Sequence, residues 1–166
     1  MKRFNKLLIC LLLVFAVLFT LASCDDKPQP VQLTDLTLPE LDGNQMAVII
    51  KNGDNDYTSY VVTLGKGGVE ATTCEQVLEY LKTKSKLVLT WEDGAFGKFI
   101  KAIGGITVDP TNQYVEIFTS NTQFQGDWAG VETRVAGDTT LVSASKGVTE
   151  LGVAAGDVVY FERASF

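Results

Sequence analysis

A single amphipathic helix among strand-like segments is the feature that most constrains this fold. The apolar residues that recur at helical spacing are Cys74, Val77, Leu78 and Leu81. Thr73 can cap the helix, and Gln76 three residues later completes the pattern of a capping box. We therefore predict a helix over residues 73–84 that lays one apolar face on a sheet.

The segments around this helix read as strands, because β-branched and aromatic residues alternate there between turn residues. These strand segments are residues 46–52, 57–64, 86–91, 113–119, 131–135, 140–143 and 158–161. One helix combined with several antiparallel strands predicts an α+β fold, with the sheet packed on the helix.

The N-terminus has the order of a bacterial export signal. Basic residues within the first six positions precede a nearly continuous apolar run over residues 7–21. This run is shorter than the ~20 residues that a spanning helix needs, which favours a cleaved signal peptide over residues 1–23. The sequence Leu-Ala-Ser-Cys that ends at Cys24 resembles a lipobox and predicts lipidation of Cys24. The alternative is an ordinary secretory signal that leaves Cys24 as a free thiol.

The domain organisation follows from this signal. Residues 24–45 contain prolines and acidic residues, which predicts a lipidated Cys24 followed by a flexible tether. A short edge strand within residues 31–38 is the alternative for part of the tether. Residues 46–166 then form one domain. A diacylated N-terminus would hold that domain on the outer face of the cell membrane.

Charge and composition exclude several function classes. The chain has 20 acidic and 14 basic residues, a net charge of −6, which argues against nucleic acid as a partner. Because the chain has no histidine, it has no Ser-His or Cys-His nucleophile and no imidazole metal ligand. Ser143-Ala-Ser-Lys146 lacks the partner motifs of penicillin-recognising enzymes. We therefore expect no enzymatic activity, no metal centre and no cofactor.

Two further patterns have simple structural interpretations. The cluster over residues 52–56 lacks the glutamate that a calcium loop requires at its twelfth position, so we interpret it as a hairpin turn. Cys74 could be activated at a helix N-terminus, but without a histidine partner we interpret it as a buried core residue.

Two glycine-rich stretches carry aromatic residues. In the first, over residues 91–106, Phe96 and Phe99 flank Gly97 and Lys98, and Gly94 adds backbone freedom. In the second, over residues 122–130, the aromatic residues are Phe124 and Trp128. We interpret these stretches as binding loops. The alternative is that their aromatic residues complete the core.

The first stretch also carries a family resemblance. Gly94-x-Phe96-Gly97-x-Phe99-Ile100-x-x-Ile103-x-Gly105 resembles a motif of the transcobalamin-like C-terminal domain family. The helix start and the glycine turns before the last strand are similar too, so the resemblance covers residues 72–166. It implies a β-grasp fold and cobalamin, or a related corrinoid, as ligand. Tyr114-Val115 stands where the family usually has Tyr-Trp, which removes one ligand contact.

We therefore expect a lipid-anchored module of the cell surface that binds a small molecule on its aromatic and glycine-rich loops. The residues predicted to contact the ligand are Phe96, Gly97, Lys98, Phe99, Tyr114, Phe124 and Trp128. The alternative function is that of a structural or adhesive lipoprotein, in which the same loops contact another surface protein.

Overall fold

The computed structural model of the protein describes residues 27–95 and 97–166, and most of its regular structure is strand. The two helices of the described chain are α2 (Cys74–Lys84) and the short 3₁₀ helix η1 (Thr122–Phe124). The strands in chain order are β1 (Val31–Leu33), β2 (Gln45–Gly53), β3 (Asp56–Thr63), β4 (Leu89–Gly94), β5 (Gly97–Ile103), β6 (Ile106–Thr107), β7 (Gln113–Thr119), β8 (Thr133–Ala136), β9 (Thr139–Ser143) and β10 (Val158–Ser165).

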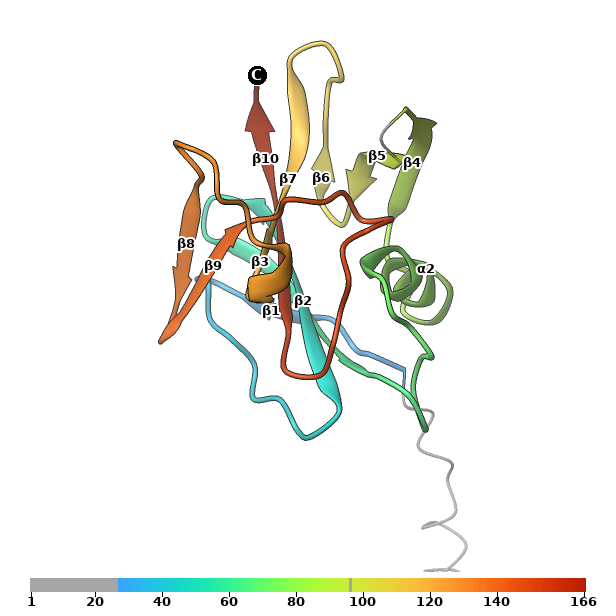
Figure 1. Cartoon of the computed structure of the whole chain (residues 1–166). Coiled ribbons are helices and arrows are strands. Elements are labelled where there is room, and N and C mark those ends of the chain that lie inside the picture. Colours follow the sequence, from blue (N-terminus) through green and yellow to red (C-terminus); the bar gives the residue numbers. More distant parts are fainter. Residues whose placement is uncertain (1–26, 96) are drawn as a thin grey trace, which may run out of the picture.

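The strands form two sheets. The larger has seven strands in the order β1-β3-β2-β10-β7-β9-β8, and the smaller has three in the order β4-β5-β6. Strand β10 runs parallel to β2 and antiparallel to β7, so the last strand lies in the middle of the larger sheet. Figure 1 shows α2 and β4–β5 on one side of these central strands and the β8–β9 hairpin on the other.

The predicted fold class, an α+β β-grasp-like mixed sheet packed on one amphipathic helix, is wrong. The protein is mostly β: its seven-stranded sheet is accompanied by a second sheet, and α2 is a short element of 11 residues. The error arose in residues 91–106, where we interpreted the glycines as a loop. Gly94 and Gly97 instead face each other in a β-hairpin, and Gly97 has a φ of 97° that favours glycine. The hairpin of β4 and β5 adds β6 and becomes the second sheet.

The predicted helix is confirmed, with Thr73 as its N-cap. The side chain of Gln76 accepts hydrogen bonds from the backbone N–H of Thr73 at 3.2 Å and of Thr72 at 2.8 Å. The predicted stripe is buried, with Leu78 0% exposed. The hairpin expected over residues 131–143 is also confirmed as β8 and β9, with Ala136 paired to Thr139.

Alternating residues of the central strands build two separate cores. On β2, Met46, Val48 and Ile50 face one side, and Ala47 and Ile49 face the other. The first side is the helix-side core, which includes the stripe of α2 and the buried isoleucines of the smaller sheet. The second is the hairpin-side core, and its buried residues are Ala47, Ile49, Phe118, Ala136, Leu141, Val158 and Tyr160.

The segment expected to be a flexible tether contributes to the domain from residue 31 onwards. Strand β1 pairs with β3, which makes it an edge strand of the larger sheet. Leu36, Leu38 and Leu41 are partly buried against the hairpin-side core. Cys24 and the predicted signal peptide lie outside the described residues, so lipidation stays a prediction. No helix within residues 27–95 or 97–166 combines the length and apolar character needed to cross a membrane.

Candidate functional site

Three of the predicted ligand contacts of the first aromatic stretch, Gly97, Lys98 and Phe99, lie on β5. Phe96 lies outside the described residues. Phe99 is half-buried and packs against the helix-side core. Phe124, from the second stretch, also packs against this core, where a Cβ at Gly152 would collide with its ring. Phe99 and Phe124 therefore present only part of each ring to solvent.

Lys98 already has protein partners. Its Nζ lies 3.0 Å from a carboxylate oxygen of Asp93 and 3.8 Å from one of Glu75, and it stands 5.2 Å from the ring centre of Trp91. The hydrogen bond to Asp93 raises the pKa of Lys98. Because Glu75 belongs to α2 and Asp93 to β4, Lys98 connects the smaller sheet to the helix.

Tyr114 and Trp128, two further predicted contacts, line one groove with a volume of about 320 Å³, which we call the Tyr114–Trp128 groove. Tyr114 comes from β7 and Trp128 from the loop between η1 and β8. The groove is also lined by residues 143–147, which begin at the last residue of β9 and include Lys146. A second hollow of about 310 Å³ lies between Lys146 and Gly97. The shared segment 145–147 thus joins the groove to the β4–β5 hairpin.

Trp128 is 48% exposed, although it is among the largest side chains of the protein. Gly126 allows its position, because a Cβ there would overlap the indole ring. The Tyr114 ring lies 5.0 Å from the ring of Phe166, centre to centre, at a tilt of 32°. Burial, together with the negative charges of Glu116 and Glu132, raises the pKa of the Tyr114 hydroxyl, which stays protonated at neutral pH. The groove thus offers two aromatic rings and one neutral hydroxyl.

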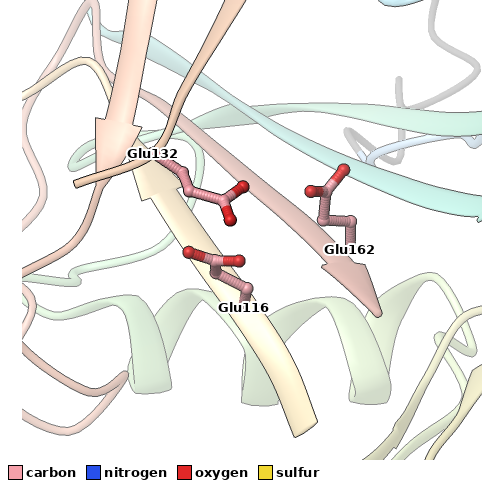
Figure 2. A group of neighbouring side chains, drawn as sticks. All are labelled: Glu116, Glu132 and Glu162. Carbon is pink, nitrogen blue, oxygen red and sulfur yellow. The ribbon is translucent and has the colours of Figure 1, made fainter. Parts of the chain in front are cut away.

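Three glutamates, which the sequence analysis missed, lie together at the end of the hairpin-side core (Figure 2). Glu116 on β7 and Glu162 on β10 are direct cross-strand partners, and Glu132 precedes β8. One carboxylate oxygen from each glutamate lies within 4.8 Å of the corresponding oxygens of the other two. Like charges opposite each other on a sheet repel, so this arrangement needs a compensating cation.

Arg134 supplies positive charge to two of the three glutamates, Glu132 and Glu162. Its Nε donates to Glu162 Oε1 at 3.0 Å, and its Nη2 donates to the same oxygen and to Glu132 Oε2, the latter at 2.7 Å. The hydroxyl of Tyr160 donates to Glu162 at 2.6 Å, and that of Ser143 donates to Glu116 at 2.7 Å. Burial opposes the charge of Arg134, but the bonds to the two glutamates outweigh it and raise its pKa.

These contacts determine what the glutamate cluster can do. Carboxylate oxygens suit hard divalent cations, but such an ion would have to displace the guanidinium that already occupies the cluster. We interpret the cluster as an ion-pair network that fastens the β8–β9 hairpin to β7 and β10. A usable sequence signal was the presence of Glu116 and Glu162 in strands rich in apolar residues, where a buried charge needs a partner.

Comparisons with known proteins leave the family open. No family model matches the chain, and no curated protein matches it. Among solved structures, it is similar to one from Ruminococcus gnavus ATCC 29149 that is described as a "putative metal binding protein". The two share 15% sequence identity at a TM-score of 0.49, over 75% of this chain and 99% of the other. A likeness at this level carries no argument about function.

Proposed function

We propose that the protein is a lipid-anchored binding module of the cell surface that takes a flat small molecule in the Tyr114–Trp128 groove. The observation that carries the proposal is that Tyr114 and Trp128, from separate elements, line one groove. Aromatic rings offer large contact area to a flat ligand, and their polar atoms orient it. The Trp128 indole is nearly half exposed, so a ligand that covers it would remove apolar surface from water.

The polar rim of the groove limits the ligand further. Glu116 and Lys146 line the groove, so both signs of charge are present. Lys146 is paired with Glu150 at 2.9 Å, and Glu116 accepts from Ser143. Since Lys146 is already in an ion pair and Glu116 already accepts a hydrogen bond, we infer a ligand that is largely neutral and is held mainly by its apolar faces.

A corrinoid remains a compound to test. The resemblance that suggested it also implied a β-grasp fold, which the protein does not have, so the corrinoid now rests on the residue pattern alone. With no histidine in the chain, cobalt could not be held through imidazole. A bound cobalamin should therefore keep its absorption spectrum, because its axial ligands would not change.

The alternative, an adhesive surface protein, is favoured by Phe166. This C-terminal ring is 81% exposed and packs on Tyr114 beside the groove. Exposed aromatic residues are common in protein interfaces. In this alternative the groove and Phe166 together would contact a protein, and no dissolved small molecule would saturate the site.

Tryptophan fluorescence tests the proposal, because Trp91 and Trp128 are the two tryptophans of the chain. Purified protein is titrated with cyanocobalamin and a panel of flat aromatic compounds while fluorescence and melting temperature are recorded. We expect a ligand that raises the melting temperature and changes Trp128 emission, with the response kept in Trp91→Phe. Trp128→Ala should lose binding, and Val135→Ala, at an exposed site elsewhere, should keep it. Saturable binding that survives Trp128→Ala would refute the groove as the site.

A further inference from the structure

Ser59 stands out because its hydroxyl has no hydrogen-bond partner although the residue is only 2% exposed. Its cross-strand partners are Val31 on β1 and Ile49 on β2, so the hydroxyl lies on an apolar face. Buried polar side chains almost always have a partner, and each exception needs an explanation. Ser59 is the one unsatisfied buried side chain within residues 27–95 and 97–166.

Ser59, the residue that carries this buried hydroxyl, lines a pocket between the edge of the larger sheet and the segment that follows β1, which we call the Ser59 pocket. Its volume is about 140 Å³. Its apolar walls are Val31, Leu33, Leu38, Pro39 and Val61. Thr37 is exposed and also lines it, while no charged side chain of the described chain does. The pocket thus combines an apolar wall with one buried hydroxyl.

The side chains of this pocket offer few partners to a bound water. A buried water typically makes about three hydrogen bonds, and the polar side chains of the described chain that line the pocket are those of Ser59 and Thr37. An apolar cavity of about 150 Å³ in a protein stays dry and accepts molecules such as benzene or xenon. A pocket of this size therefore fits a single ring or a short branched chain.

We propose that the Ser59 pocket is a second ligand site, which binds a small neutral molecule of about one ring in size. A single hydroxyl or carbonyl oxygen of this molecule hydrogen-bonds to Ser59 Oγ, as in phenols or short alcohols and ketones. The site is separate from the Tyr114–Trp128 groove, because β3 and β1 form one edge of the seven-stranded sheet, and β7 and β9 lie beyond β2 and β10. Charged ligands are excluded because no wall residue would compensate their charge.

Phenol and benzene are matched probes for this proposal, since they differ by one hydroxyl. Isothermal titration of the purified protein should show saturable binding of both. Ser59→Ala should weaken phenol by about 2- to 10-fold, the effect of one net hydrogen bond, and should not weaken benzene. Ser165→Ala, on β10 away from the pocket, should change neither affinity. Equal weakening of both probes, or of neither, would refute the role of Ser59.

A crystal structure of the wild-type protein soaked in phenol decides the site without any variant. We expect the phenol ring between Val61 and Leu38, with its oxygen within hydrogen-bond distance of Ser59 Oγ. Val61→Phe should fill the pocket and abolish binding of both probes, whereas Val135→Phe on the exposed face of β8 should not. Phenol bound only elsewhere, or an ordered water on Ser59 that phenol does not displace, would overturn the proposal.

Discussion

The two cores of this protein share the strands β2 and β10 but differ in how they end. The helix-side core is apolar throughout, from Met46 on β2 to Leu78 on α2. The hairpin-side core is smaller and runs from Ile49 into the network of Glu162 and Arg134. Apolar burial is non-directional and scales with area, whereas the network depends on every partner being in place. One sheet therefore carries two kinds of core. The helix-side core is held by non-directional apolar burial, and the hairpin-side core ends in hydrogen bonds that require a defined geometry.

Removing apolar volume from the helix-side core should have the largest effect. Leu78→Ala deletes part of a fully buried side chain, and we expect a loss of about 2–5 kcal/mol in the free energy of unfolding. Glu79→Ala, at the next position and partly exposed, should change it by less than ~0.5 kcal/mol. Denaturant titration of both variants measures this. Equal effects would show that the helix-side core does not depend on the stripe.

Breaking the network should cost less, because Arg134 is partly exposed. Arg134→Met leaves the buried carboxylate of Glu162 without its main donor, and we expect a loss of about 1–3 kcal/mol. Glu162→Gln in the same chain removes the uncompensated charge and should restore part of this loss. A double-mutant cycle by denaturant titration measures the coupling. A coupling near zero would mean that the hairpin-side core is held by its apolar residues alone.

Alkaline pH should lower the free energy of unfolding through one group in each core, and the loss should begin at a different pH for each group. Burial raises the pKa of the Cys74 thiol in the helix-side core, and burial with the hydrogen bond to Glu162 raises that of Tyr160 in the hairpin-side core. Both groups stay protonated in the folded state, so their contribution is complete below the ordinary pKa and is lost as pH rises above it. Each group then lowers stability by up to about 1.4 kcal/mol per pH unit.

Variants separate the two alkaline contributions. Cys74→Ala should remove the part that begins near the ordinary thiol value of 9.0, and Tyr160→Phe the part that begins near 10.0. Stability is measured by urea titration from pH 7 to 11, against the wild type at each pH. If neither variant flattens the curve, other groups govern the alkaline loss.

Local signals were enough to predict some elements. The helix was predictable because Thr73 and Gln76 mark its start, and the β8–β9 hairpin because turn residues separate two alternating segments. The second sheet was not, because glycines such as Gly94 and Gly97 permit both a loop and a tight hairpin. The strand order was also not predictable, because no local sequence pattern around β10 indicates that it pairs with β2.

In the candidate site, too, some residues were predictable from local sequence, whereas their arrangement in space was not. Tyr114 and Trp128 were both predicted as ligand contacts, but their common groove depends on the path of residues 143–147. Phe99 and Phe124 carry the same sequence signal yet pack on the helix-side core, because composition does not reveal which side of an element is covered. The glutamate network and Ser59 become visible only when distant segments pair.

The position of β10 affects how the chain can fold during synthesis. Ala47, near the start of the domain, pairs with Val158, close to its end. Contacts this distant in sequence form slowly, because a long loop must close before they are made. Until residues 158–165 have been synthesised, β2 lacks its central neighbour and cannot shield Ile49 or Val48. The larger sheet therefore cannot be completed until nearly the whole domain has left the ribosome.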